Sequence, residues 1–408
     1  MRCAKQAKKN PREIAQIIVD HLPENDLIES VEIAGPGFIN IRLTPASYQS
    51  VLFDVLVQKE NYGKGEIPEG MRYVNLEYVS ANPTGPMHVG HGRWAALGDA
   101  TARVMRHAGY DVYEEFYIND AGVQMDLFGK SVACRYLQLL GQDIPMIENG
   151  YGGGYIKDIA QGIIDRDGDK WVDVDEETRT VEFREIAYAE MLQLMKDTLA
   201  GFRQQVRLLV LRSAASTSTV PDGTSPVSRS IKAMDEKGYI YVKDGATWFK
   251  SSAFDDEKDR VLIKANGEMT YFMSDVAYHY NKMERGFDHL VNIWGADHHG
   301  HVARLQAALD GLGLDGSHRL VVVLMQLVNL MQDGKPVRMS KRSGKTIALH
   351  DLLDEISVDA ARYFFNSRAS TSPLDFDLDL AVREDSENPV LTMSSTPTPD
   401  LLPHCPSG

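Results

Sequence analysis

Two histidines in a glycine-bearing turn form the first group of residues that could do chemistry. They stand in the run Pro86-Met87-His88-Val89-Gly90-His91-Gly92. Gly90 lets a ligand approach the backbone, and the helix that follows would offer free N–H groups and a positive dipole end to an anion. His88 and His91 could donate hydrogen bonds to phosphate oxygens. The turn predicts a phosphate site, with an ordinary surface turn as the alternative.

A glycine-flanked basic loop at residues 333–345, DGKPVRMSKRSGK, is the second candidate, with five cations in eleven residues. A lysine such as Lys341 suits the β- and γ-phosphates of a nucleotide, where charge builds up as pyrophosphate leaves. Taken alone, the loop could equally be a solvated basic segment. The occurrence of both sites, at two halves of one predicted sheet, favours nucleotide chemistry.

The elements that must position these sites predict an α/β fold. A strand at 72–80, a helix at 91–107 and a strand at 111–118 make a βαβ unit, the building block of a parallel sheet. The pattern returns with a strand at 288–294, a helix at 299–311 and a strand at 319–325. An insertion of about 121–265 separates the halves, with helices expected at 122–140 and 182–199 and strands at 239–249 and 260–264.

A small α+β unit is predicted before the sheet. It consists of a helix at 11–22, strands at 27–34 and 38–43, and a helix at 45–59. The predicted domains are therefore residues 1–65, residues 66–390 with the insertion, and a tail at 391–408.

Composition excludes several classes of protein. The chain has 408 residues, a net charge of −15 and 43% hydrophobic residues, which argues against intrinsic disorder and against nucleic-acid binding by bulk positive charge. Its longest apolar stretch, 320–331, is too short to span a bilayer. The three cysteines are scattered, odd in number and form no CxxC pair, which argues against a disulfide framework and against a cysteine-based zinc site. The N-terminus has no apolar core of a secretory signal, so a cytoplasmic location is expected.

Two segments lack any helical or strand period. The first is 203–230, where nine of the eighteen residues from Ser213 to Ser230 are Ser or Thr. The second is 391–408, which holds four prolines and six Ser or Thr. Both are interpreted as low-complexity or unstructured sequence, with regular patterning resuming at Ile231. Reading-frame shifts are one hypothesis for both, and resequencing of the locus would test it.

The two motifs and their flanks carry a family resemblance. HVGH at 88–91 and RMSKR at 338–342 match the HIGH and KMSKS signatures of class I aminoacyl-tRNA synthetases. The flanks resemble arginyl-tRNA synthetases in particular, through NLEY at 75–78, SANPTGPMHVGHGR at 80–93, YINDAG at 117–122, WGADHHGH at 294–301 and VDAARYFF at 358–365. This resemblance implies a Rossmann-like parallel sheet, and an N-terminal domain that contacts tRNA.

The resemblance also implies a reaction. The carboxylate of L-arginine would attack the α-phosphate of ATP, brought with Mg²⁺, and the arginyl group would pass to the terminal adenosine of tRNA(Arg). His88, His91 and Lys341 are the implied catalytic residues. The implied ATP-binding residues are Pro83, Gly85, His88, Gly90, His91, Met339, Ser340 and Lys341. Arg338 stands where the motif usually has Lys, which keeps the charge and changes the geometry, so a supporting role is expected.

An arginine pocket can be argued from the chemistry of the guanidinium, which prefers carboxylates in its own plane. Glu77 stands at the carboxyl end of the first sheet strand, where open α/β sheets bind ligands. Tyr271 and Asp275 are four residues apart on one face of a predicted helix. In the family, residues matching Glu77, Asn82, Tyr271 and Asp275 line this pocket. The alternatives are a core aromatic at Tyr271 and a plain surface acid at Asp275.

The cluster Asp297-His298-His299-Gly300-His301 lacks a second ligand set at zinc spacing, so no protein-bound metal is expected. Asp297, His298 and His301 are predicted to support ribose or substrate binding.

The likeness ends near Val390, where the family continues into a helical anticodon-binding domain, and the N-terminal domain looks clipped. Enzymes of this family generally need bound tRNA before they activate arginine, so weak activity is expected without the anticodon-binding domain. A monomer is expected as well. The alternatives are a truncated, inactive synthetase-like protein and an adenylyltransferase that works without tRNA.

Overall fold

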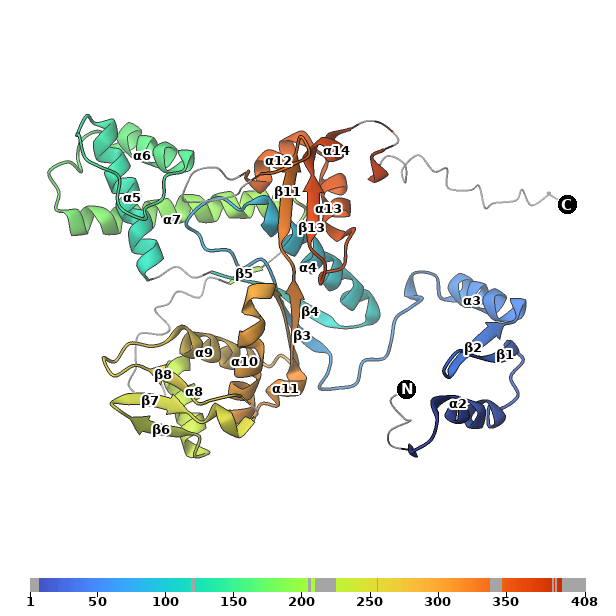
Figure 1. Ribbon diagram of the computed structural model, residues 1–408. Coiled ribbons are helices and arrows are strands. Elements are labelled where there is room, and N and C mark those ends of the chain that lie inside the picture. The colour runs from blue at the N-terminus through green and yellow to red at the C-terminus, as the bar shows by residue number, and fades with distance from the viewer. Residues whose placement is uncertain are drawn as a thin grey trace. The chain divides into compact units, whose positions relative to one another are not determined.

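The computed structural model describes residues 7–118, 122–204, 225–254, 256–337, 347–383, 385 and 387–390, together with the backbone of 207–209. The chain divides into two compact units, Met1–Glu66 and Ile67–Gly408, and Figure 1 names their elements. Residues 338–346 and 391–408, on which the basic-loop and tail predictions fall, lie outside the described residues. No helix among the described residues is long and apolar enough to cross a membrane.

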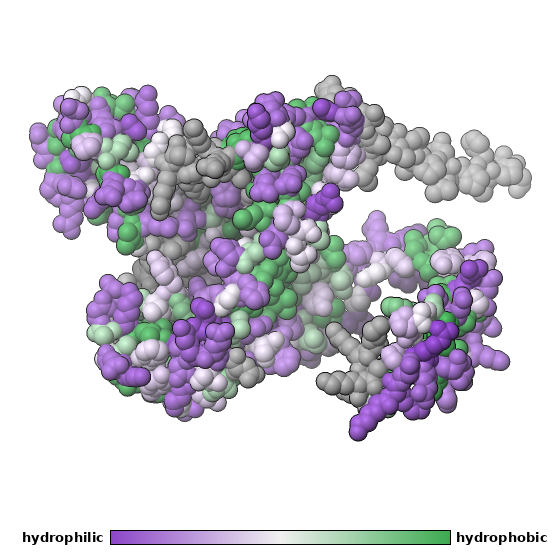
Figure 2. All heavy atoms as spheres, in the orientation of Figure 1, coloured by the Kyte–Doolittle hydropathy of each residue, from purple (hydrophilic) through white to green (hydrophobic). Residues whose placement is uncertain are grey.

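The first unit has the predicted order of elements. Helix α2 (Pro11–Asp20) begins at the N-cap Asn10, whose side chain accepts from the Arg12 N–H, and Pro11 occupies the first helical position. Strands β1 (Ile28–Ala34) and β2 (Phe38–Leu43) pair antiparallel. Helix α3 (Pro45–Gln58) and the short 3₁₀ helix η1 (Lys59–Asn61) follow. Large apolar side chains of α3 are exposed within this unit, as Figure 2 shows.

A five-stranded parallel sheet forms the centre of the second unit, in the order β10-β9-β3-β4-β5. Its strands are β3 (Tyr73–Glu77), β4 (Asp111–Tyr117), β5 (Arg207–Leu209), β9 (His289–Gly295) and β10 (Leu320–Met325). Helix α4 (Val89–Ala108) connects β3 to β4, and helix α10 (His299–Gly311) stands between β9 and β10. The α/β prediction of a parallel sheet interrupted by an insertion is confirmed.

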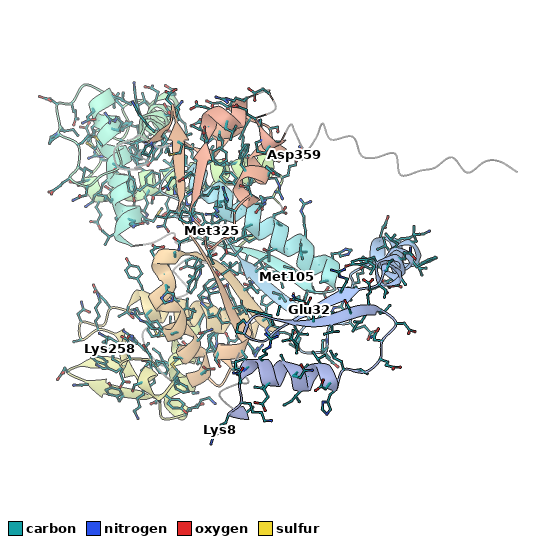
Figure 3. All side chains as sticks on the ribbon, turned by 45° about the vertical axis from the view of Figure 1, so that its right-hand side comes forward. Lys8, Glu32, Met105, Lys258, Met325 and Asp359 are labelled. Carbon is teal, nitrogen blue, oxygen red and sulfur yellow. The ribbon has the colours of Figure 1, made fainter. Side chains whose placement is uncertain are left out.

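The two faces of the sheet have different chemistry because successive side chains of a strand point to opposite sides. Val74 and Leu76 of β3 pack with Ala102 of α4 in one apolar cluster. Met105 of α4 and Met325 at the end of β10, both labelled in Figure 3, belong to the same layer. Asn75 and Glu77 alternate with these residues and are also buried, so polar side chains lie on the opposite face.

Helix α9 (Tyr271–Glu284) covers that opposite face, together with α10. Met273 and Val276 of α9 share an apolar cluster with Leu290 of β9 and Leu305 of α10. The N-cap Thr270 accepts from the Met273 N–H and starts the helix. The helix predicted from the spacing of Tyr271 and Asp275 is therefore present.

The insertion contains more helix than the sequence patterns predicted. Helices α5 (Val123–Leu139) and α7 (Glu176–Gly201) match predictions, whereas α6 (Gly154–Asp167) was not predicted. The strand expected at 239–249 is a hairpin of β6 (Ile240–Lys243) and β7 (Ala246–Phe249), because Gly245 takes a left-handed φ of 75° in the turn. Strand β8 (Arg260–Ile263) extends this small antiparallel sheet, and the 3₁₀ helix η3 (Ser251–Phe254) precedes it.

The expectation that residues 203–230 lack regular structure was wrong in two places. Strand β5 lies within this segment and pairs with β4 in the central sheet. Regular structure resumes at α8 (Pro226–Glu236), five residues before Ile231. Ser225 caps this helix by accepting from the Ser228 N–H, and Pro226 fits the first helical position. The composition of this segment suggested unstructured sequence, but Ser225 and Pro226 begin a helix.

The remaining elements lie between or after the last two strands of the central sheet in the chain. A second sheet has the order β12-β11-β13, with β11 (Val328–Gln332), β12 (Lys335–Val337) and β13 (Leu374–Asp377). The short helices are η4 (Ala296–His298), α11 (Gly316–Arg319), α12 (Leu349–Glu355), α13 (Val358–Asn366) and α14 (Leu378–Val382). Phe365 of α13 and Leu349 at the start of α12 belong to one core cluster with Val89 of α4, so these helices support the start of α4.

Candidate active site

The histidine turn lies at the N-terminus of α4, where the helix leaves its first N–H groups without helical partners. His88 is the N-cap, and its backbone N–H donates to Nδ1 of His91 at 3.0 Å. The two imidazole rings stack with their centres 3.7 Å apart. A Cβ at Gly90 would lie 2.8 Å from two atoms of the His88 ring, so a larger residue would displace that ring. The structure thus brings His88, Gly90 and His91 together.

A short antiparallel bridge connects this turn to the chain directly after the basic loop. The Leu349 N–H donates to the Met87 carbonyl at 2.7 Å, and the Val89 N–H donates to the Ile347 carbonyl at 3.3 Å. His88 and Ala348 pair across the same bridge. The predicted residues Arg338, Met339, Ser340 and Lys341 lie outside the described residues.

The loop before the turn, which holds the predicted residues Pro83 and Gly85, is buried. The hydroxyl of Tyr155, on α6, donates to the Thr84 carbonyl at 2.8 Å. A Cβ at Gly85 would lie 2.8 Å from that hydroxyl. Burial raises the pKa of Tyr155, so the phenol remains a donor at neutral pH. The insertion therefore supports the loop through a residue that sequence reasoning missed.

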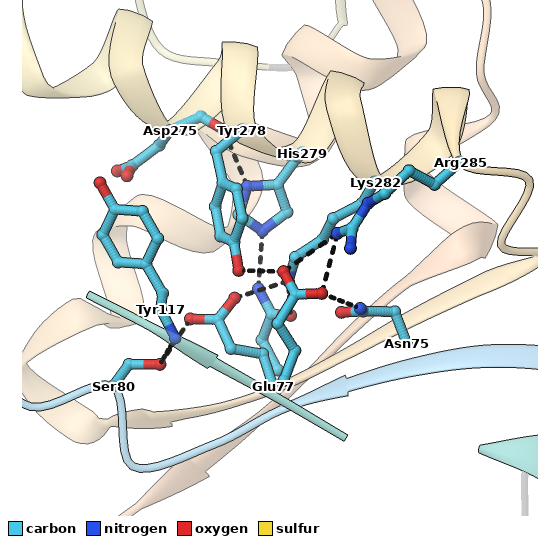
Figure 4. A network of polar contacts seen from close by, with 11 residues as sticks. Asn75, Glu77, Ser80, Tyr117, Asp275, Tyr278, His279, Lys282 and Arg285 are labelled. Carbon is cyan, nitrogen blue, oxygen red and sulfur yellow. Dashed lines mark hydrogen bonds and ion pairs between the residues drawn. The ribbon is translucent and has the colours of Figure 1, made fainter. Parts of the chain in front are cut away.

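Glu77 ends β3 inside a buried polar network, shown in Figure 4. Its Oε2 accepts from the Lys282 Nζ at 2.5 Å, and its Oε1 accepts from the Ser80 hydroxyl at 2.9 Å. Ser80 in turn accepts from the Tyr117 N–H at 3.1 Å. Lys282 also donates to Asn292 Oδ1 at 3.4 Å. Both oxygens of the predicted Glu77 are therefore fixed by neighbours.

A second buried carboxylate, Glu115 on the adjacent strand β4, extends the network. It accepts from the Tyr278 hydroxyl at 2.5 Å, from Arg285 at 2.8 and 3.0 Å, and from the Asn75 amide at 2.7 Å. Burial and the nearby carboxylates raise the pKa of Tyr278 well above its usual value, which keeps its hydroxyl a donor. Each of these buried charges thus has an opposite charge or a donor beside it.

Asp275 joins the same network from α9. Its Oδ2 accepts from His301 Nε2 at 2.7 Å, and its backbone carbonyl accepts from His279 Nδ1 at 2.8 Å. Asn292 donates its amide to His279 Nε2 at 2.7 Å. Burial, with the nearby Lys282, lowers the pKa of His279 to about 3, so its ring is neutral and can accept that bond. A chain of polar contacts therefore runs from Glu77 through Lys282, Asn292 and His279 to the backbone carbonyl of Asp275, whereas the Asp275 carboxylate contacts His301.

Tyr271 and Asn82 are the other two residues predicted for the arginine pocket. Among the contacts that the structure describes, neither joins this network. Tyr271, the first residue of α9, is 82% exposed, so the core-aromatic alternative is wrong. Asn82 is exposed, and its amide donates to the Gln124 side chain at 2.9 Å. Both side chains can be reached by a ligand from solvent.

The predicted cluster at 297–301 splits into two parts. His301 contacts Asp275 as described, whereas the exposed His298 lies 3.7 Å from Asp297 on η4. Within the part of the chain that the structure describes, no group of three His, Cys, Asp or Glu side chains is arranged to hold a metal ion.

Sequence reasoning missed Lys282, Tyr278, Arg285 and Glu115. A helical-spacing signal existed, because Asp275, Tyr278, His279 and Lys282 fall at one face of the helix that was predicted. The partners of that face lie on strands far away in the sequence, so the signal did not show what the face would contact.

Comparison with known proteins is consistent with this geometry. The family model for the arginyl tRNA synthetase N terminal domain matches residues 1–43, and the model for the class I (R) tRNA synthetase catalytic domain matches residues 51–152 and 156–372. The arginine–tRNA ligase of Carboxydothermus hydrogenoformans is 47% identical over 96% of this chain and 69% of that protein. The corresponding ligase of Geobacillus thermodenitrificans is 45% identical, with the same coverage.

Solved structures agree with the sequence relatives. A crystal structure from Campylobacter jejuni, assigned to an arginyl-tRNA synthetase, is 35% identical with a TM-score of 0.73, covering 86% of this chain and 74% of that chain. The Thermus thermophilus arginyl-tRNA synthetase has a TM-score of 0.65 at 18% identity, covering 94% of this chain and 71% of that chain, and supports the fold alone.

Proposed function

The chain belongs to the class I arginyl-tRNA synthetase family, and from this premise we propose that it activates L-arginine with ATP and transfers it to tRNA(Arg). The observation that carries the proposal is the position of Glu77 and Asp275. The Glu77 carboxylate is joined through Lys282, Asn292 and His279 to the backbone carbonyl of Asp275. The Asp275 carboxylate contacts His301 of α10, which follows the carboxyl end of β9. Helix α4, which starts with the histidine turn, leaves the sheet at the same edge.

The reaction needs positioning and charge stabilisation. The arginine carboxylate attacks the α-phosphate of ATP, pyrophosphate leaves, and arginyl-adenylate forms. The 3′-terminal adenosine of the tRNA then attacks the arginyl carbonyl carbon, and AMP leaves. ATP brings Mg²⁺ with it, and the protein holds the reacting groups in line.

We assign the phosphate-binding role to the histidine turn. His88 and His91 would donate to phosphate oxygens, helped by the free N–H groups at the start of α4. Gly90, Pro83 and Gly85 would border the nucleotide. This role is supported by the stacked histidines and by the buried loop before them.

The basic segment is proposed to meet the leaving pyrophosphate through Lys341, with Met339 and Ser340 at ATP and Arg338 in support. The support comes from the family match and from Ile347, which follows Lys341 by six residues and accepts a hydrogen bond from Val89 beside His88. A cation at this place would stabilise the charge that develops on pyrophosphate.

Arginine recognition is assigned to Glu77 and Asp275, with Tyr271 and Asn82 at the rim and Asp297, His298 and His301 in support. A guanidinium can donate parallel, charge-assisted hydrogen bonds to a carboxylate. Lysine has no such planar fork and would leave acceptors in the pocket unpaired, which disfavours it strongly. We further propose a cytoplasmic monomer.

Arginine-dependent exchange of pyrophosphate into ATP, measured with tRNA(Arg) present, tests the proposal. Asp275→Asn should lower kcat/KM for arginine by about 100-fold, because it removes a charge-assisted contact, while KM for ATP stays within about twofold. Asp315→Asn is the matched control, since Asp315 forms a similar carboxylate–histidine pair, with His318 at 2.6 Å, on the exposed surface.

Equal exchange with lysine, or unchanged arginine kinetics in Asp275→Asn, would contradict the assignment.

A further inference from the structure

A buried lysine that contacts Glu77, the carboxylate proposed for arginine recognition, has no role in the reaction described above. Lys282 stands on α9, seven residues or about two helical turns after Asp275. Its side chain is 0% exposed, so substrate atoms have no access to its Nζ. That Nζ donates to Glu77 and to Asn292, and lies 4.5 Å from the centre of the Tyr278 ring. Lys282 can therefore act only through the groups that surround it.

The charge balance of this region depends on Lys282. A buried charge is strongly unfavourable without a partner, and removing one member of a buried pair leaves the other uncompensated. The Glu77 side chain is 7% exposed, and Lys282 is the cation within ion-pair distance of its carboxylate among the described residues. Without that ammonium, the carboxylate would be driven to turn toward solvent.

Orientation of Glu77 matters because a guanidinium binds in the plane of a carboxylate. Lys282 holds Oε2 from α9, and Ser80 holds Oε1 from the loop after β3. A carboxylate oxygen can accept two hydrogen bonds, so each oxygen keeps one acceptor position. Two parallel N–H groups of a guanidinium fit these two positions only while the plane of the carboxylate is held.

We propose that Lys282 is a positioning residue for arginine recognition, which fixes the Glu77 carboxylate in the plane that receives the substrate guanidinium. Asn292 assists by accepting from Lys282, and it is itself oriented by its bond to the neutral His279. The inference rests on the function proposed above. It adds to the residues that contact the substrate a further residue, Lys282, which orients the Glu77 carboxylate.

Equilibrium dialysis of the whole chain with radiolabelled L-arginine, and separately with ATP, tests this role without requiring turnover. Lys282→Met should raise the Kd for arginine about 30-fold and leave the Kd for ATP within about twofold, because the groups that lose a contact with Lys282, namely Glu77, Asn292 and Tyr278, are not among the residues assigned to ATP. Lys282→Arg keeps a buried cation and should restore arginine binding to within about fivefold of the original. Arg229→Met is the control, because it removes an ion pair at Glu284, on the same helix and away from Glu77.

Two further measurements separate positioning from general loss of structure. The melting temperature of each variant is recorded by circular dichroism. The double variant Glu77→Gln/Lys282→Met replaces the buried pair by neutral groups and should fold even where Lys282→Met does not. Since Lys282 acts through Glu77, the double variant should bind arginine no more weakly than Glu77→Gln alone.

Three outcomes would overturn the inference. One is arginine binding by Lys282→Met within twofold of the original chain. Another is a parallel loss of arginine and ATP binding, and the third is additive losses in the double variant. Failure of the original chain to bind arginine saturably, or equal affinity for lysine, would instead refute the proposed function.

Discussion

Replacement of Arg93 by methionine should destabilise the unit that contains the histidine turn. Arg93 lies on α4, two residues after His91, and is 1% exposed. Its guanidinium donates to the carbonyls of Gln326, Ala369 and Ser372, each at 2.9 Å. Burial lowers the pKa of Arg93, and the carbonyl dipoles stabilise its charge. This side chain thus joins the helix of the histidine turn to two segments more than 230 residues away.

The expected loss follows from these contacts. Each hydrogen bond from a charged donor contributes about 1.5–3 kcal/mol, so the three bonds together contribute about 4.5–9 kcal/mol. Arg93→Met recovers part of this free energy because it no longer buries a guanidinium. The free energy of unfolding is therefore expected to fall by about 4 kcal/mol. Arg93→Lys keeps the charge without the planar fork and should lose about 2 kcal/mol.

Urea unfolding followed by tryptophan fluorescence measures the effect. With an m value of about 3 kcal/mol per M, a loss of about 4 kcal/mol lowers the midpoint by about 1.3 M. Arg103→Met is the control on the same helix, because the Arg103 side chain is 63% exposed and its ion pair with Asp99 should contribute less than about 1 kcal/mol. A midpoint shift below about 0.3 M for Arg93→Met would refute the reasoning.

Three other predictions concern stability and recognition. Burial lowers the pKa of His279 to about 3 in the folded chain, so between about pH 3 and 6.5 the unfolded chain binds more protons than the folded one. The free energy of unfolding should therefore fall by about 2 kcal/mol from pH 7 to 5. Denaturant titrations at the two pH values should show this fall, and the part due to His279 should be absent in His279→Gln. Gly98→Ala should lower the melting temperature, since its Cβ would lie 2.3 Å from the Tyr78 ring, whereas Gly162→Ala, with no atom within 4 Å, should raise it. Tyr271→Phe should leave the melting temperature unchanged, because the side chain is exposed, and weaken arginine binding about tenfold in dialysis; unchanged binding would remove Tyr271 from the pocket.

Local patterns were sufficient to predict most elements of the central sheet. Alternation along β3 separated Val74 and Leu76 from Asn75 and Glu77, and the structure places these pairs on opposite faces. Helix α6 was missed because its start carries three glycines, Gly152, Gly153 and Gly154, which a sequence pattern assigns to a loop. The start of α8 was missed because Ser225 and Pro226 suggest a loop by composition and a helix cap by position.

The candidate site also contains some features that are local in the sequence and others that depend on distant residues. The pair His88 and His91 is local in sequence, and the turn that contains it was identified from spacing alone. The roles given to all the site residues, including His88, His91, Glu77 and Asp275, stay predictions, since they rest on family likeness. The contact of Asp275 with His301 could not be predicted, because it depends on how the starts of α9 and α10 meet.

The sequence by itself determined the alternating strands, the glycine-bearing turn at the start of α4 and the two signatures that identify the family. Those features depend on residues only a few positions apart. The tertiary structure alone decided that Lys282 compensates Glu77, which is 205 residues away, and that Arg285 compensates Glu115, which is 170 residues away. Buried charges need partners, but spacing along a chain does not say which distant strand will supply them; that is decided when the sheet forms and α9 packs on its polar face.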